Sequence, residues 1–368
     1  ADYIFISPSV DTLADSPFIY PSWKVMANFS ERYETINNRY GISDWNKDIE
    51  FDLTPQDSFI IGKVWLKIER GPLSRVGGTY ARFIPNEGYM ALEKVTFTQG
   101  TELLQTRDSF MKIIEYDSEM SDYEQRNERE LAFADLTVPE RDATSAVSSV
   151  LYVDLTPWWT KWSRMYLKTG IIGTPIRIKG KLRALNDMVD TDANSVSCPI
   201  TSISLLTQSF EVMSNEKALH LSNSLKKGGI QFRTFDYQTQ EHFLAAGDSS
   251  YKIKLDNLTL PSNAIFFFIL KNSDLSSTLP NPGHRYDNYI PVKTAKMTAG
   301  QVDVTRIHTD KELKYIIGAR SIGFRGRNIY CLPFSLDVAN IQAASGHKTP
   351  ARMNTPVLEL TFDAPLAE

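Results

Sequence analysis

Residues 332–362 read LPFSLDVANIQAASGHKTPARMNTPVLELTF, and this stretch decides the fold class. It opens on a short apolar run at 332–336 and passes through a turn at Ser345-Gly346-His347. It closes on 357–362, where apolar and polar side chains alternate as they do in a half-buried strand. This stretch therefore predicts a strand, a long turn-rich loop and a terminal strand, in that order.

The same alternation recurs through the rest of the chain. Within 58–70, the apolar residues Val64 and Leu66 alternate with Lys63 and Lys67. Further strands are predicted at 91–98, 102–105, 149–155, 175–185, 203–212, 229–234, 251–255, 264–270, 302–307 and 328–332. Many short strands with turn residues between them are typical of an all-β sandwich or barrel.

Helical signals are few. Thr156 is a cap-type residue, and Pro157 suits the first position of a helix. Short helices are predicted at 107–119, 121–129, 157–167 and 215–225. The segment 275–291 carries three prolines and a glycine, and we expect a long surface loop there.

The signals follow a similar order in the two halves of the chain, which suggests an internal duplication. The polar, turn-rich segment 190–202 is the best candidate for a linker between them. We therefore expect a first domain at 48–195 and a second at 196–368. Residues 1–47 hold aromatic residues without a clear period, so we interpret them as an N-terminal arm laid on other surfaces.

Composition limits the function classes. A hydrophobic content of 42% and a charged content of 23% are globular values, and a net charge of −4 argues against a main role in nucleic-acid binding. Two cysteines, Cys198 and Cys331, cannot form a disulfide framework. The apolar run 264–270 has the length of a buried strand rather than of a membrane span, and the first residues lack the pattern of a signal peptide.

The closing stretch resembles the C-terminal end of the double jelly-roll major capsid proteins of large double-stranded DNA viruses and their relatives, the nucleocytoplasmic large DNA virus and virophage type. The matching residues are Phe334-Ser335-Leu336, Ser345-Gly346, Arg352, Asn354 and Leu358-Glu359-Leu360-Thr361. Weaker matches follow the family order at 57–66, 88–97, 101–114, 151–155 with Pro157-Trp158-Trp159, 232–239 and 257–270. Two departures are the lack of the family's apolar run in 161–175 and a chain that is short for the family, which implies reduced outer loops.

The resemblance implies two consecutive eight-stranded jelly rolls with a few short helices in loops. It also implies a homotrimer that forms a pseudo-hexagonal capsomer in the icosahedral shell of a virion, assembled inside the host cell. The implied partners are other copies of the chain, neighbouring capsomers, and minor capsid and penton proteins. An internal membrane beneath the shell is left open, and no sequence-specific contact with nucleic acid is expected.

Candidate site residues are sparse. We expect the aromatic cluster Trp158, Trp159, Trp162 and Tyr166 to pack between barrels or subunits rather than to bind a ligand. The five histidines, His220, His242, His284, His308 and His347, are widely spaced, and His308 with Asp310 and His284 with Asp287 come nearest to a site. The sequence thus predicts no catalytic residue, no cofactor and no metal, and hence no enzyme.

Charged segments carry weaker hypotheses. Arg320, Arg325 and Arg327 form either a solvated turn or a basic patch that meets a neighbouring subunit or an anionic surface. The carboxylates Glu128, Glu130 and Asp135 are expected on a solvated face. Asn28 and Asn257 begin glycosylation sequons whose use the sequence does not decide.

Two other function classes compete with the capsid interpretation. A carbohydrate-binding, lectin-like jelly roll would need an exposed aromatic site. A cupin-type enzyme would need clustered His and Glu ligands, which the spacing does not offer.

Overall fold

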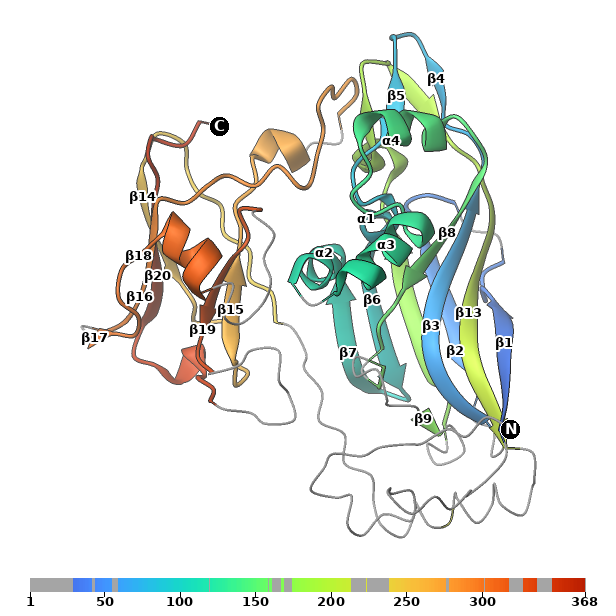
Figure 1. Ribbon diagram of the computed structural model, residues 1–368, viewed down its shortest axis with the longest axis horizontal. Coiled ribbons are helices and arrows are strands. Elements are labelled where there is room, and N and C mark those ends of the chain that lie inside the picture. Colours follow the sequence, from blue (N-terminus) through green and yellow to red (C-terminus); the bar gives the residue numbers. More distant parts are fainter. Residues whose placement is uncertain are drawn as a thin grey trace.

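The computed structural model describes residues 29–41, 44–54, 59–118, 120–157, 159–160, 167–168, 174–212, 223, 238–275, 278–300, 302–317, 327–335 and 346–367. These residues form two β-rich units that lie beside each other (Figure 1). We call the N-terminal unit the first barrel and the C-terminal unit the second barrel.

The first barrel is made of two facing antiparallel sheets. One has the order β1 (Phe29–Asn37), β13 (Ile200–Val212), β3 (Phe59–Arg70) and β8 (Ser149–Asp154), with β9 (Leu167–Lys168) also paired to β3. The other has the order β2 (Asp48–Leu53), β10 (Ile176–Leu182), β6 (Leu92–Gln99) and β7 (Glu102–Asp108). Two facing sheets, each built on four strands in this crossed order, form a jelly roll.

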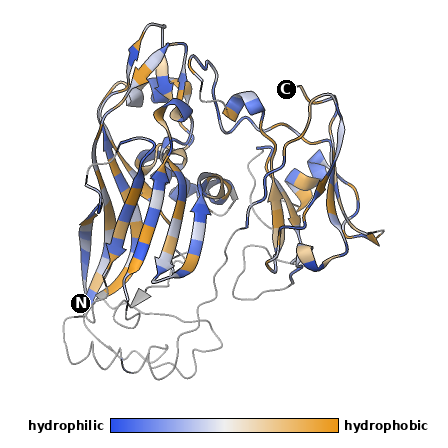
Figure 2. Ribbon diagram, turned by 180° about the vertical axis from the view of Figure 1, so that it is seen from behind, coloured by the Kyte–Doolittle hydropathy of each residue, from blue (hydrophilic) through white to orange (hydrophobic). Residues whose placement is uncertain are grey.

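Alternation along the strands explains how each sheet buries one face. In β3, Val64, Leu66 and Ile68 are fully buried between the sheets, whereas Lys63 is exposed on the outer face. Figure 2 shows the same change from hydrophobic to hydrophilic residues along neighbouring strands. A shift of the pairing by one residue would turn the apolar set outward, so the buried face fixes the register.

Long connections carry the helices and small strand pairs of the first barrel. They contain β4 (Ser74–Val76) paired with β12 (Ser195–Ser197), β5 (Ala81–Phe83) paired with β11 (Val189–Thr191), α1 (Glu87–Ala91), α2 (Ser109–Ser118), α3 (Asp122–Leu131), α4 (Val138–Ser145) and η3 (Leu185–Met188). Ser121 and Glu124 form a capping box at the start of α3, where a helix was predicted. The helix predicted from 107 begins two residues later, because β7 continues to Asp108.

The second barrel repeats part of this topology. One sheet has the order β14 (Ser250–Lys254), β20 (Pro356–Thr361), β16 (Thr294–Ala299) and β17 (Val302–Asp303), with β18 (His308–Thr309) also paired to β16. A second sheet pairs β15 (Ala264–Phe267) with β19 (Tyr330–Pro333). The short helical elements are η4 (Asn272–Leu275), the π-helical turn η5 (Glu312–Ile317) and η6 (Pro350–Arg352).

The chain order of the strands is the same in the two four-stranded paths, since β2-β10-β6-β7 corresponds to β14-β20-β16-β17. The internal duplication suggested by the sequence is therefore visible as topology. β19 and β20 also confirm the strands predicted at the two ends of the closing stretch. Residues 336–345 between them, the strand predicted at 229–234, the helix predicted at 215–225 apart from residue 223 and most of the helix predicted at 157–167 lie outside the described residues.

Two expected domain borders need correction. Residues 29–37 belong to the first barrel as β1 rather than to an arm, because they pair along their whole length with β13. β13 also pairs with β3, so residues 200–212 belong to the first barrel and not to the second. Pairing between strands far apart in the chain decides both points. Residues 1–28 of the predicted arm lie outside the described residues.

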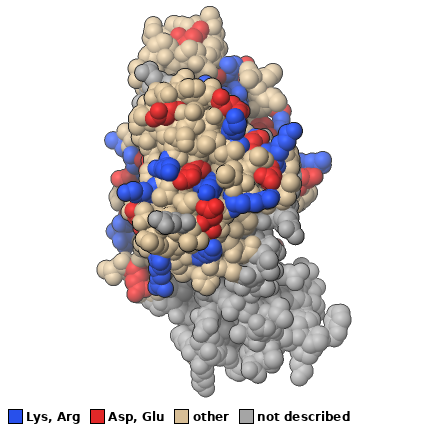
Figure 3. Space-filling model, turned by 90° about the vertical axis from the view of Figure 1, so that its left-hand side faces the viewer, with Lys and Arg blue, Asp and Glu red and all other residues tan. Residues whose placement is uncertain are grey.

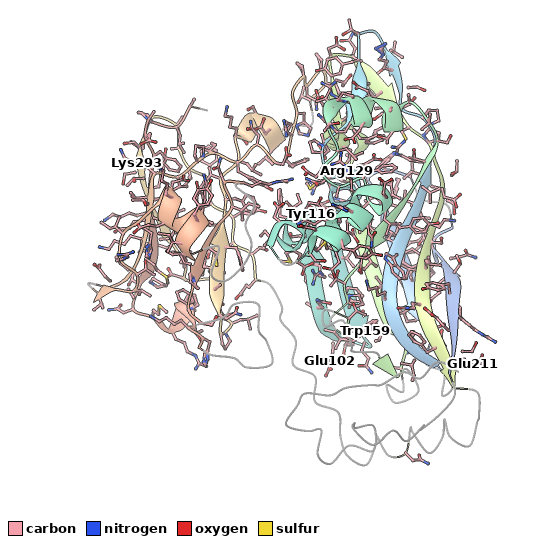
Figure 4. The ribbon with its side chains drawn as sticks, viewed as in Figure 1. Glu102, Tyr116, Arg129, Trp159, Glu211 and Lys293 are labelled. Carbon is pink, nitrogen blue, oxygen red and sulfur yellow. The ribbon has the colours of Figure 1, made fainter. Side chains whose placement is uncertain are left out.

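Trp159 fills the interior of the first barrel. Its side chain, which Figure 4 labels, is fully buried. Its Nε1 donates a hydrogen bond to the carbonyl oxygen of Gly62 at 2.9 Å, and its ring meets Phe97 edge to face at 6.1 Å. The expectation that this tryptophan packs between barrels or subunits is therefore wrong. Trp158, Trp162 and Tyr166 of the same cluster lie outside the described residues.

We predict that Trp159→Ala lowers the free energy of unfolding by about 3–5 kcal/mol, because it leaves a cavity between the sheets and an unpaired carbonyl at Gly62. Urea unfolding measures the loss. Tyr123→Ala is the control, since Tyr123 is 73% exposed and its truncation should change stability by about 0.5 kcal/mol or less. Equal effects of the two substitutions would contradict the interior role of Trp159.

Candidate functional site: the contact between the two barrels

The strand pair β15–β19 is buried on both faces. On one face, Ile265 and Leu332 belong to the apolar core of the second barrel. On the other face, Phe266 and Phe268 pack against the core of the first barrel, and Cys331 is part of that core. This explains why the sequence AIFFFIL is apolar throughout rather than alternating, since a strand covered on both faces has no solvated side.

Aromatic rings form the centre of the contact between the barrels. Phe110 of α2 lies 5.2 Å from the ring of Phe268 and 6.1 Å from that of Tyr286. Phe268 in turn meets Tyr289 at 5.0 Å, and the Arg183 guanidinium stands over the Tyr286 ring at 4.9 Å. Such pairs contribute about 0.5–1.5 kcal/mol each beyond the area that they bury.

A loop of the second barrel crosses onto the first barrel. We call residues 279–291 the strap. The Asn281 amide donates to the Thr191 carbonyl at 3.0 Å, and His284 Nε2 lies 2.9 Å from the Asp187 carbonyl oxygen. His284, Tyr286 and Tyr289 are each at most 5% exposed. The segment predicted as a surface loop is thus, in this part, an element that joins the barrels.

Asp190 of β11 is the polar anchor of the strap. Its carboxylate is 2% exposed and accepts hydrogen bonds from Arg82 Nε at 2.9 Å, from the Tyr80 hydroxyl at 3.0 Å and from the Gly283 amide at 2.7 Å. Arg141 Nη1 lies 4.0 Å away. A buried carboxylate needs this number of partners to offset its desolvation.

Arg327 adds an ion pair across the same contact. Its guanidinium lies 3.4 Å from Asp117 of α2 and 2.6 Å from Asp135. Burial by itself would lower the pKa of Arg327, but the two carboxylates raise it above the usual value. Of the predicted basic patch, this arginine therefore meets the neighbouring barrel of its own chain, while Arg320 and Arg325 lie outside the described residues.

The three carboxylates predicted on a solvated face differ in their exposure. Glu130 is exposed, and Asp135 is exposed but pairs with Arg327. Glu128 is buried, and it accepts a hydrogen bond from the Tyr89 hydroxyl at 2.8 Å. For Glu128 the expectation is wrong, because α3 turns this residue toward the barrel, while the neighbouring Arg129 pairs with the partly exposed Glu140.

The remaining histidines and the sequons do not gather into a site. His242 and His347 are exposed, and burial lowers the pKa of His308. His220 and Asn28 lie outside the described residues, and Asn257 is exposed in the turn after β14. In the described part of the chain, no group of three or more His, Cys, Asp and Glu residues could hold a metal ion. No helix there is long and apolar enough to cross a membrane.

A small cavity lies in the first barrel beside α2. Its lining includes Tyr89, Arg107, Lys112 and Asp154, and its volume is about 20 Å³. This volume holds about one water-sized group.

Comparison with known proteins gives a fold match. No protein-family profile and no curated protein sequence matches the chain. The solved Faustovirus major capsid protein is similar with a TM-score of 0.70 at 10% identity, over 97% of this chain and 91% of that chain. The PBCV-1 protein VP54, fitted into a reconstruction of the virophage Sputnik, is similar with a TM-score of 0.66 at 12% identity, over 94% of this chain and 86% of that chain.

A third similar structure, from the Sputnik virophage, gives a TM-score of 0.60 at 11% identity, over 97% of this chain and 89% of that chain. The matches run through both barrels and nearly the full length of each chain. The chain therefore has the double jelly-roll fold that the closing stretch of its sequence suggested.

We predict that Asp190→Ala lowers the free energy of unfolding by about 3–5 kcal/mol, because Arg82, Tyr80 and the Gly283 amide lose a buried partner. Urea unfolding followed by fluorescence measures it. Asp192→Ala is the matched control, since Asp192 also accepts hydrogen bonds, from Thr79, but lies near the surface. An Asp190→Ala loss no larger than that of the control would contradict the anchoring role.

We also predict a pH dependence that comes from Glu128. Burial raises the pKa of the Glu128 carboxyl above its usual value of 4.5. Burial also raises the pKa of the Tyr89 hydroxyl well above its usual value, so Tyr89 stays protonated and Glu128 is the member of the pair that titrates. The folded chain therefore holds this proton more tightly than the unfolded chain, so the contribution of Glu128 to stability is present below pH 4.5 and is lost as the pH rises through the folded pKa.

Glu128→Gln removes this titration and keeps an acceptor for the Tyr89 hydroxyl. The wild type should therefore lose stability relative to the variant as the pH rises from about 4.5 toward 7, so the unfolding free energy of the variant minus that of the wild type increases. Urea unfolding at a series of pH values measures the difference. A difference that stays constant with pH would show that Glu128 does not titrate as proposed.

Proposed function

We propose that this chain is the major capsid protein of an icosahedral double-stranded DNA virus and that it resides in the shell of the virion. The observation that carries the proposal is the match of both barrels to the Faustovirus major capsid protein over nearly the whole of each chain. The proposed role is structural, and the contacts between the two barrels support it.

The contact between the barrels supports this role mechanically. Three independent devices hold the two barrels together, namely the two-faced strand pair β15–β19, the strap on Asp190 and the Arg327 ion pairs. A chain whose barrels are held in this way presents two similar barrels in a fixed relative orientation. Three such chains complete a closed ring of six barrels, which is the pseudo-hexagonal capsomer proposed here.

The surface charge fits a protein that meets other proteins. The side of the second barrel seen in Figure 3 carries Lys and Arg interspersed with Asp and Glu. Neighbouring strands there pair opposite charges, as Lys252 does with Glu359 at 3.2 Å and Lys296 with Asp303 at 2.7 Å. An even mixture of signs gives little long-range attraction for a nucleic acid. We therefore propose other capsomers and minor capsid and penton proteins as partners.

We predict that the purified chain forms a homotrimer, which native mass spectrometry at micromolar concentration detects as three chain masses. Electron microscopy should show particles with a hexagonal outline, because six alike barrels surround one axis. A folded chain that stays monomeric in both measurements would count against the capsid role. A glycan array serves as the control for the lectin-like alternative, which predicts specific binding where the capsid proposal predicts silence.

A further inference from the structure

The contact between the two barrels of one chain joins two different kinds of surface. The first barrel contributes its helical connection between β7 and β8, in which α2 presents Phe110. The second barrel contributes the outer face of β15–β19, with Phe266 and Phe268. The contact is therefore head to tail, and a head-to-tail contact can be repeated by further copies.

The topological repeat places both kinds of surface on each barrel. Because β2-β10-β6-β7 corresponds to β14-β20-β16-β17, the connection from β7 to β8 corresponds to the one from β17 to β19, which carries η5. In the same way β15–β19 corresponds to β3–β8, because each pair joins a strand that precedes the hairpin β16–β17 or β6–β7 to the strand that follows the connection. Within one chain, the helical surface of the first barrel contacts the strand surface of the second barrel. The helical surface of the second barrel and the strand surface of the first barrel take no part in this contact.

The unused helical surface is apolar at its tip. Tyr315 and Ile316 of η5 are 62% and 58% exposed, and we call these two residues the η5 patch. The residues before them are anchored, because Leu313 is fully buried and Lys314 Nζ lies 2.7 Å from Asp310 Oδ1. Asp310 also accepts a hydrogen bond from the Tyr330 hydroxyl at 2.8 Å. Two adjacent large apolar side chains thus stand in water on an anchored element, where a partner surface can cover them.

The unused strand surface carries aromatic and apolar side chains among its charges. We call the outward side chains of β3 and β8, namely Trp65, Lys67, Glu69, Val150 and Tyr152, the β3–β8 face. They alternate with the buried Leu66 and Ile68. Val150 is 40% exposed, and Trp65 and Tyr152 are half-buried. In Figure 1 the sheet of β1, β13 and β3 lies on the side of the first barrel away from the second barrel.

We propose that the η5 patch of one copy docks on the β3–β8 face of the next copy, and thereby repeats between chains the contact that α2 makes with β15–β19 within a chain. This inference rests on the proposed capsid function and names the surfaces that close its ring. The occupant is a second copy because the same two kinds of surface already meet inside each chain. Three copies joined in this way leave neither surface open.

Two sets of substitutions test the pairing. Tyr315→Glu with Ile316→Lys removes the apolar η5 patch. Val150→Lys with Tyr152→Glu removes apolar area from the β3–β8 face, and it places the new charges opposite Glu69 and Lys67, their cross-strand neighbours. Each variant should associate about 10- to 100-fold more weakly than the wild type, as is typical for loss of buried aromatic or apolar anchors.

Mixing the two variants gives the sharper measurement. Each variant retains the surface that the other lacks, so the mixture should contain one intact contact and form a one-to-one dimer that native mass spectrometry detects. Neither variant alone should form it, and the mixture should not close into a trimer. Phe243→Asp is the control, because Phe243 is 82% exposed and lies in neither surface, and this variant should form trimers like the wild type.

The outcomes separate this inference from the proposed function. A wild-type chain that never associates overturns the proposed function itself. A wild-type trimer with unchanged association of both variants, or a mixture without the one-to-one dimer, overturns only the pairing of these two surfaces. An effect of Phe243→Asp as large as theirs does the same. Circular dichroism checks the fold of each variant, and the single substitutions Ile316→Lys and Val150→Lys repeat the mixing experiment if a double variant does not fold.

Discussion

The burial of β15–β19 on both faces is the constraint on which the rest of the structure depends. One set of side chains completes the core of the second barrel, and the alternate set, which includes Phe266, Phe268 and Cys331, completes the core of the first. A strand pair in this position belongs to two cores at once. The apolar area that it buries therefore stabilises both barrels and their relative orientation, so the barrels do not move as independent domains.

Polar contacts fix the orientation of the two barrels, which the apolar contact alone does not specify. A flat apolar contact leaves rotation about its normal weakly specified, whereas hydrogen bonds and ion pairs require particular atoms to meet. The strap places the Gly283 amide on the Asp190 carboxylate, and Arg327 reaches Asp117 and Asp135 from another side of the contact. If the barrels turned, the Gly283 amide would lose its acceptor and Arg327 would lose both carboxylates, and an unpaired buried charge is costly.

The two barrels share a strand order but use their surfaces differently. In the first barrel the long connection after β7 forms helices that cover the contact, and in the second barrel the corresponding connection forms η5 and leaves Tyr315 in water. This difference is what makes a head-to-tail arrangement of copies conceivable. It also explains why the repeat is hard to see in the sequence, since the two halves share the order of their strands but differ in the connections between them.

The sequence alone determined the local features whose causes lie within a few residues. Alternation in 58–70 and 357–362 gave strands β3 and β20, and Ser121 with Glu124 gave the start of α3. The ordered resemblance of the closing stretch also pointed to the double jelly roll. Only the tertiary structure decided where β1 and β13 belong, because pairing such as that of Ile200 with Arg70 joins residues whose separation in the chain carries no local signal. The same holds for Trp159, Glu128 and the strap, since burial depends on which distant segments pack against a side chain, and no pattern along the chain records that.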